Sequence, residues 1–236
     1  MSAARRSPAP RIELDHLVVA ARTLEEGVAW SEATLGIVPG PGGRHAMMGT
    51  HNRLLDISSA RHPRSFLEII AIDPAAPAPQ RARWFDLDAP ALQRAIASGP
   101  RLVHWVARTG GVVASAAQLR ASGHDPGTPT TVERMAPRGM LRWRITLRAD
   151  GCRPAGGALP LLIEWAGEHP CDALAPSGLS IERLELGGVS VALAALVGAE
   201  AGDAAAAGRL DVVPLKAILA TPKGRIELVS PGTLGA

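Results

Sequence analysis

The sequence predicts an α+β protein in which paired βαβββ modules form a cupped, mixed β-sheet half-barrel with flanking helices, followed by a third, shorter module. Two observations predict this fold. First, an order of one strand, one helix and several strands occurs three times along the 236 residues. Second, each copy ends alike, because Glu68, Glu164 and Glu227 each stand before two apolar residues and a nearby proline. Half-barrels of this kind bury their inner faces only by pairing.

The first copy shows the clearest element signals. Residues 14–21 are rich in branched apolar side chains and predict a strand. Thr23 is a suitable N-cap, acidic residues follow it, and Gly36 ends the apolar pattern, so a helix is expected between them. Two further strands are expected at residues 51–58 and 65–72.

The second and third copies repeat this order with different side chains. The second has strands at 101–109, 130–136, 140–149 and 159–167 and a helix at 113–123. The third has strands at 179–188, 209–216, 217–221 and 225–230 and a helix at 189–202. The chain is therefore divided into a disordered tail (1–10), module one (11–75), a linker with a short helix from about Asp88 to Ser98 (76–100), module two (101–170) and a third partial module (178–232).

Composition limits the possible partners. The net charge is only +3 and no long Lys/Arg block occurs, so a small-molecule substrate is expected rather than a nucleic acid or a membrane. Cys152 and Cys171 are too few for a disulfide framework, which favours a reduced, cytoplasmic protein. The third copy has no histidine at the position equivalent to His16 and His104 of the other copies. It is therefore expected to be structural or to form a homodimer.

Four polar residues interrupt the apolar strands at equivalent positions of the first two copies. His16 and His104 lie in the first strand of each copy, and Glu68 and Glu164 lie in the last. If the halves close face to face, two imidazoles and two carboxylates meet, which suits a divalent transition metal such as Zn, Ni, Fe, Mn or Co. A bound cation would also offset the burial of two carboxylates. Each residue alone has a simpler explanation, as a hydrogen-bonded or solvent-facing strand residue.

The stretch "LDHLVVAARTLEEGVAWSEATLGIVPGPGGRHAMMGTHNRLLDI" resembles the opening of bacterial glyoxalase-like domain proteins of the vicinal oxygen chelate superfamily. The matching features are the histidine after an aspartate, the Gly-Gly-Arg-His loop and the Gly-Thr-His-Asn turn. The resemblance implies paired βαβββ modules and a ligand set of His16, Glu68, His104 and Glu164. It also implies a metal-dependent lyase or isomerase that stabilises an enediolate or enolate, with Glu164 or Glu68 as the general base.

Two other activities stay open at this point. One is a metal-free, small-molecule sequestering protein of the bleomycin-resistance type, and the other is an extradiol-type dioxygenase. His51 and Asn52 are candidates for substrate contact, although loop residues of this kind also cap turns. Trp105, Trp143 and Trp165 either wall an apolar cavity or fill the core. Of the three, Trp143 is assigned to substrate binding. A further alternative is a non-catalytic scaffold that associates through the third copy.

Overall fold

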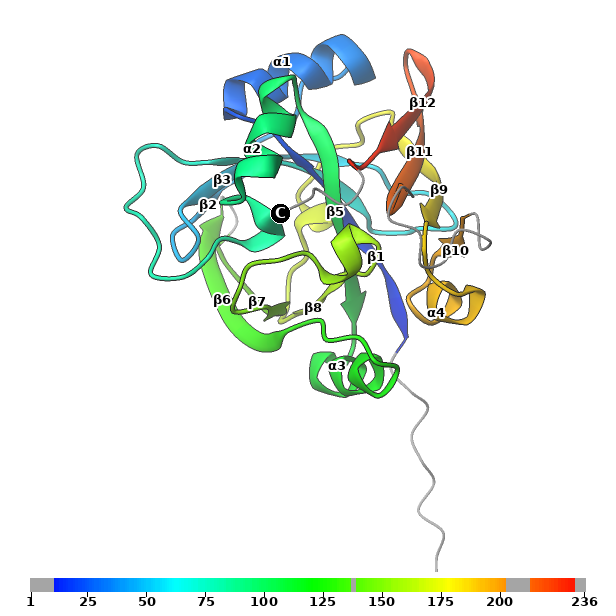
Figure 1. The fold of residues 1–236 in the computed structure, drawn as a ribbon. Helices are drawn as coiled ribbons and strands as arrows, with labels where there is room; N and C mark the ends of the chain where they lie inside the picture. Colours follow the sequence, from blue (N-terminus) through cyan, green and yellow to red (C-terminus); the bar gives the residue numbers. More distant parts are fainter. Residues whose placement is uncertain (1–10, 137–138, 203–212, 232–236) are drawn as a thin grey trace, which may run out of the picture.

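The structure is a computed structural model that describes residues 11–136, 139–202 and 213–231. The predicted tail and the first half of the predicted strand at 209–216 lie outside the described residues. Figure 1 shows the main sheet at the centre, α1 and α2 at one end, α3 at the other and the small second sheet to one side. No helix in the described ranges is long and apolar enough to cross a membrane.

The first module follows the predicted order closely. It consists of β1 (Ile12–Ala20), α1 (Leu24–Leu35), β2 (Arg44–His45), β3 (Thr50–Asp56) and β4 (Phe66–Ile72). The linker contains a short 3₁₀ turn, η1 (Trp84–Asp86), and then α2 (Pro90–Ala97). The sequence predicts the helix α2 but not η1, whose residues Trp84 and Phe85 line the pocket.

The second module repeats the arrangement of the first. Its elements are β5 (Arg101–Thr109), α3 (Val112–Ala121), β6 (Thr128–Ala136), β7 (Gly139–Leu147), the 3₁₀ turn η2 (Pro154–Gly157), β8 (Leu161–Trp165) and the 3₁₀ turn η3 (Pro170–Asp172). Together the two modules form one eight-stranded sheet in the order β2-β3-β4-β1-β5-β8-β7-β6. β1 pairs antiparallel with β5, so the halves join through their first strands. The predicted α+β fold with paired βαβββ modules is confirmed.

The third module forms a separate four-stranded sheet in the order β10-β9-β11-β12. Its elements are β9 (Ser180–Leu186), α4 (Val191–Leu196), β10 (Glu200–Ala201), β11 (Leu215–Thr221) and β12 (Gly224–Val229). The helix predicted over 189–202 was too long. It begins at its N-cap Ser190, ends at Leu196, and Gly198 follows with φ 75°, a conformation that suits glycine and ends the helix.

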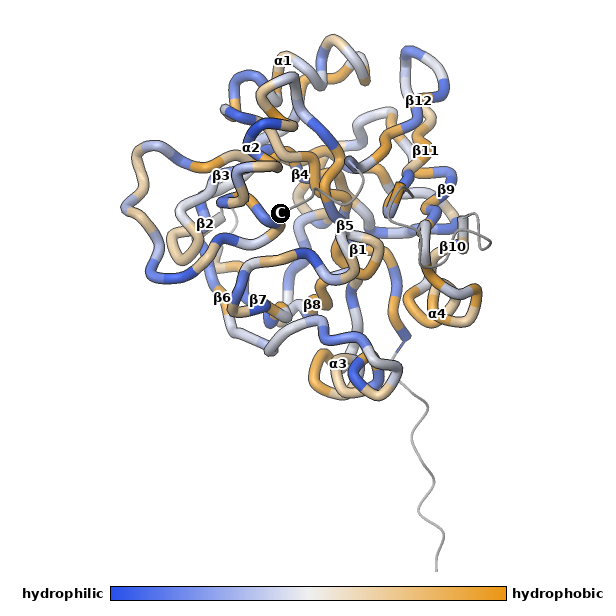
Figure 2. Tube along the Cα trace, viewed as in Figure 1, coloured by the Kyte–Doolittle hydropathy of each residue, from blue (hydrophilic) through white to orange (hydrophobic). Residues whose placement is uncertain are grey.

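Two hydrophobic cores lie on opposite faces of the main sheet. The outer face packs against α1, α3 and the small sheet, with Leu17, Trp105 and Leu184 in one cluster. The concave face carries a second cluster that includes Val18, Val106 and Ile145. In Figure 2 the central strands around β4 are mostly orange, which agrees with strands buried on both faces.

Helix α1 shows how one glycine fits a helix against the sheet. Thr23 caps it as predicted, accepting a hydrogen bond from the Glu26 backbone N–H. A Cβ atom on Gly27 would lie 2.4 Å from Cγ2 of the buried Ile69. Alanine therefore cannot replace this glycine without moving the sheet or the helix.

We expect Gly27→Ala to lower the free energy of unfolding by about 1–2 kcal/mol, because overpacking outweighs the gain of about 1 kcal/mol in helix propensity. Urea unfolding followed by circular dichroism measures this. The matched control is the exposed Ala33 of the same helix, where Ala33→Gly should destabilise by about 1 kcal/mol. A more stable Gly27→Ala variant would contradict the close packing.

Candidate active site

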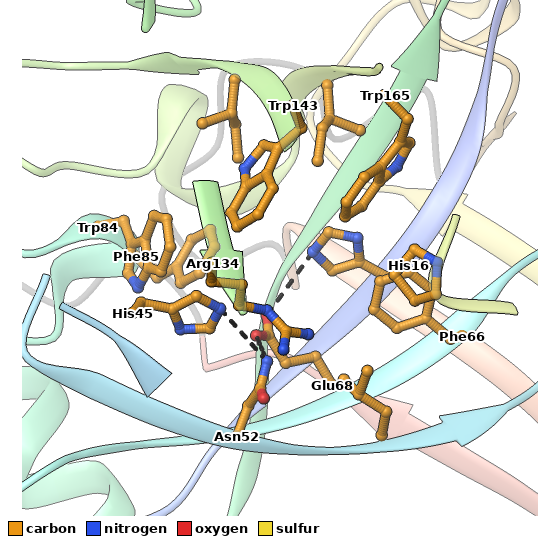
Figure 3. Close-up of a pocket in the computed structure, with 14 residues that line it drawn as sticks. His16, His45, Asn52, Phe66, Glu68, Trp84, Phe85, Arg134, Trp143 and Trp165 are labelled. Carbon is orange, nitrogen blue, oxygen red and sulfur yellow. Dashed lines mark hydrogen bonds and ion pairs between the residues drawn. The ribbon is translucent and has the colours of Figure 1, made fainter. Parts of the chain in front are cut away.

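A pocket opens on the concave face of the main sheet, with walls from both modules. The space between its walls, counted out into the open mouth, amounts to about 410 Å³. Five aromatic side chains line it, as Figure 3 shows for Phe66, Trp84, Phe85, Trp143 and Trp165. Such a wall favours a ligand with a planar or apolar body.

His16 is the first polar group of this pocket, and the preceding Asp15 holds it. The pairing of β1 with β5 shifts register between Leu14 and His16, as in a β-bulge, so the chain neighbours depart from strict alternation of faces. The Nδ1 atom of His16 lies 2.6 Å from Oδ1 of Asp15. The imidazole also stacks on Phe66 with ring centroids 4.5 Å apart. The ring is thus fixed with its Nε2 atom toward Glu68.

Asp15 is fully buried and accepts hydrogen bonds from three side chains. Besides His16, these are the Nε1–H of Trp165 at 2.9 Å and Nε2 of His169 at 3.0 Å. Burial by itself would raise the pKa of Asp15, but the hydrogen bonds from His16 and His169 hold this pKa well below its usual range. Asp15 is therefore a permanent anion beneath His16.

The tautomers of the two histidines follow from these contacts. Nδ1 of His169 accepts the backbone N–H of Cys171 at 3.1 Å, so the ring proton is on Nε2 and is donated to Asp15. Asp15, as a carboxylate, can only accept, so His16 donates from Nδ1. The Nε2 atom of a neutral His16 then carries a lone pair toward the pocket, as in a general base.

Glu68 is the second titratable group that faces the pocket. Its Oε2 lies 3.6 Å from Nε2 of His16, and its Oε1 accepts from Asn52 Nδ2 at 2.6 Å. The Asn52 orientation is set by its Oδ1, which accepts the backbone N–H of Gly43 at 2.7 Å. Asn52 Nδ2 also lies 3.5 Å from Nε2 of His45. A continuous polar row thus runs across the pocket wall (Figure 3).

His45 and Arg134 complete the polar part of the pocket. Burial, with the nearby positive charge of Arg134, lowers the pKa of His45 to about 3. His45 is therefore neutral at physiological pH. Among the described residues lining the pocket, Arg134 is the only lysine or arginine. Burial lowers its pKa and the charge of Glu68 raises it, but a guanidinium stays protonated in proteins.

His104, one of the four predicted ligands, does not join His16. It lines a different cavity on the far side of Trp84 and Phe85, which border both spaces. The Phe85 ring packs on the His104 ring with centroids 5.3 Å apart. His104 Nε2 accepts the backbone N–H of Leu161 at 3.2 Å, and burial lowers its pKa well below the ordinary value.

Glu164 lies on the opposite face of the sheet from the pocket. In β8 the residues on either side of it, Ile163 and Trp165, face the pocket, so alternation turns Glu164 outward. Its Oε2 accepts from Arg144 at 2.6 Å and from the Val112 backbone N–H, at the start of α3, at 3.1 Å. Although partial burial would raise the pKa of Glu164, these hydrogen bonds lower it.

The predicted convergence of His16, Glu68, His104 and Glu164 on one cation is therefore wrong. Within the described ranges no group of three or more His, Cys, Asp or Glu side chains is placed to hold a metal ion. The resemblance implied a divalent metal, but the four predicted ligands contribute only His16 and Glu68 to the pocket. A guanidinium, Arg134, faces the same carboxylate. This donor set does not fit a resident metal or a dioxygenase site.

The predicted substrate contacts divide between the two faces of the sheet. Asn52 and Trp143 line the pocket as expected, and so does Trp165, while Trp105 is fully buried in the outer core. His51 is next to Asn52 in β3 and points away, because neighbouring strand residues face opposite sides. His51 therefore does not line this pocket, where its substrate contact was predicted.

Several pocket groups were not predicted from the sequence. Asp15 was noted only as the residue before His16, His169 was assigned no role, and Arg134 was read simply as part of a strand. Trp84 and Phe85 come from the linker, where η1 places Phe85 at φ 62°. A buried aspartate inside an apolar strand was the one available signal, because such a group needs donors around it.

Comparisons with known proteins agree with this architecture. A crystal structure of a hypothetical protein from Staphylococcus aureus is similar, with a TM-score of 0.57 and 14% identity, covering 94% of this chain and 88% of that chain. Methylmalonyl-CoA epimerases also match. The Streptomyces coelicolor enzyme has 18% identity, a TM-score of 0.40, and coverage of 66% and 96%. The Mycobacterium tuberculosis enzyme has 17% identity, a TM-score of 0.39, and coverage of 68% and 91%.

The model of the glyoxalase-like domain family matches residues 14–212. The chain belongs to this glyoxalase-like domain family. No curated protein matches the chain significantly.

Proposed function

We propose that this protein transfers a proton at the carbon next to a carbonyl group of a small oxygenated substrate, as a lyase or isomerase without a resident metal. The observation that carries the proposal is the series Asp15–His16–Glu68, buried at the wall of an aromatic pocket. Two proton acceptors facing one cavity, with one oriented by a buried carboxylate, form an arrangement typical of general acid–base catalysis.

The division of work between the residues follows from their contacts. Glu68 or His16 removes the proton, and the other group can return one at a neighbouring position. Asp15 holds His16 in the tautomer that accepts at Nε2 and stabilises the imidazolium once it forms. The aromatic walls limit the access of water to the carbanion-like intermediate.

The test is exchange of substrate protons with solvent deuterium, followed by NMR in the presence of EDTA. The panel consists of thiol adducts of 2-oxoaldehydes, 2-methylacyl thioesters and 2-oxo acids. We expect exchange with at least one class. Glu68→Gln should slow this exchange at least about 100-fold, because it removes a proton acceptor.

Glu164→Gln is the matched control, since Glu164 holds the equivalent place in the second module but faces outward. Its exchange rate should stay within about threefold of the unmodified protein. Equal loss in both variants, or exchange that disappears in EDTA and returns with a divalent metal, would refute a metal-independent site at Glu68. Thermal unfolding of both variants checks that the fold is intact.

A second candidate function is binding without chemistry, favoured by the aromatic pocket wall. Trp143 and Trp165 lie with ring centroids 5.3 Å apart beside the polar row. A purely sequestering protein would bind planar ligands with a change in tryptophan fluorescence. It would show no deuterium exchange, and Glu68→Gln would leave its affinity nearly unchanged.

A further inference from the structure

Arg134 approaches the pocket from the far end of the main sheet. It belongs to β6, one edge strand, while β2 is the other edge in the strand order. The curled sheet brings Arg134 beside Gly43, the residue immediately before β2. Figure 3 shows its guanidinium close to Glu68 and Asn52. Arg134 has no hydrogen-bond or ion-pair partner within the part of the chain that the structure describes.

Gly43 provides the room that this guanidinium occupies. A Cβ atom at position 43 would lie 2.1 Å from Nη1 and 2.8 Å from Cζ of Arg134. The glycine itself is fixed by two hydrogen bonds with Asn52: its N–H donates to Oδ1 at 2.7 Å, and its carbonyl accepts from the Asn52 backbone N–H at 3.0 Å. The position of the Arg134 guanidinium is therefore fixed by the contact between the two edges of the sheet.

We propose that Arg134 binds the oxygen of the ligand that carries or develops negative charge, and so supplies the positive charge that a divalent metal would otherwise provide. The inference rests on the proposed proton transfer and names the ligand class, a small compound with an enolate or 2-oxo carboxylate oxygen. A guanidinium is suited to this work because it donates two parallel hydrogen bonds to a planar oxyanion.

The charges of the pocket agree with this role. In the resting site the negative charge of Glu68 faces the positive charge of Arg134. Where Glu68 is the group that takes the proton, it becomes neutral and the negative charge moves to the oxygen of an uncharged substrate. The guanidinium then pairs with that oxygen, so the proton transfer adds no net charge to the buried site. A preorganised cation in a low-dielectric cavity stabilises such a developing charge strongly.

Oxalate, a planar dianion that mimics an enediolate, tests the proposal by titration calorimetry in EDTA. We expect the unmodified protein to bind it and Arg134→Gln to weaken binding at least about 30-fold. Arg134→Lys should restore part of the affinity. The matched control is Arg142→Gln on β7, since Arg142 is exposed and pairs with Glu133. Its affinity should stay within about twofold.

Gly43→Ala is a second test that keeps the arginine in the chain. The added methyl group would displace the guanidinium, and we expect oxalate binding about tenfold weaker with little change in the unfolding temperature. Unchanged binding in Arg134→Gln, or binding by the unmodified protein only after a divalent metal is added, would overturn the inference.

The outcome also separates this inference from the proposed reaction. Oxalate binding through Arg134 without any substrate deuterium exchange supports the anion site and rejects proton transfer. Exchange that depends on Glu68 but not on Arg134 supports proton transfer and rejects the role of the arginine.

Discussion

Asp15→Asn is expected to slow substrate proton exchange by about 10³-fold and to lower the free energy of unfolding by about 3 kcal/mol. The carboxylate accepts from three donors, and an amide cannot replace it in all three places. Its oxygen can stay opposite Trp165 and His169, but its NH₂ group then faces Nδ1 of His16. Breaking a buried charge network of this kind typically destabilises by several kcal/mol.

The rate falls because His16 must change tautomer. Its Nδ1 has to accept from the new amide, so the ring proton moves to Nε2 and the lone pair toward Glu68 is lost. His169 cannot make the same change, because its Nδ1 already accepts from Cys171. ¹⁵N NMR of the imidazole nitrogens reads the tautomer directly.

The control for Asp15→Asn is Asp150→Asn, which removes a partly exposed carboxylate paired with Arg148. It should destabilise by less than about 1 kcal/mol and leave the exchange rate unchanged. An Asp15→Asn variant that keeps both its exchange rate and the original His16 tautomer would contradict the role assigned to Asp15.

The second large effect is a loss of stability in mild acid caused by buried neutral histidines. The pKa of His45 is lowered to about 3 in the folded protein, against an ordinary value of 6.5. Below pH 6.5 the unfolded chain takes up a proton that the folded chain does not, so stability falls as the pH falls from 6.5 toward 3. The full difference corresponds to on the order of 5 kcal/mol, of which about 2 kcal/mol is lost by pH 5.

His104 acts in the same direction, because burial also lowers its pKa. Urea unfolding at pH 7.5, 6 and 5 measures the effect. Below pH 6.5, His45→Gln should lower the number of protons taken up on unfolding by about one. Above pH 7, the free energy of unfolding of this variant should change with pH as it does in the unmodified protein. An unchanged pH dependence in His45→Gln would show that His45 is protonated in the folded state.

Most of the fold was predictable because local signals and repeats agree. Thr23 and Gly36 marked the ends of α1 correctly, and the three copies of one element order predicted two joined modules and a third unit. The least successful prediction was the helix of the third copy. An alanine-rich pattern continues through Gly198, so apolar periodicity alone did not show that this glycine ends the helix.

The site was only partly predictable, because a residue that recurs at the same position of two repeats can point to different sides of the sheet. Glu68 shares the concave face with Phe66, whereas Glu164 lies between two residues that take that face. A shift of one residue between the copies reverses the direction of the side chain. Arg134 was not found from the sequence because its role depends on the meeting of two sheet edges distant along the chain.

The aromatic pair Trp84 and Phe85 has a consequence for the depth of the pocket. These side chains belong to the connector between the duplicated halves, yet they form the floor that separates His16 from His104. The depth of the cavity is therefore set by the linker, which lies outside both modules. Replacing Trp84 and Phe85 by small residues would join the two spaces and admit longer ligands without any alteration to the strands that carry His16 and Glu68.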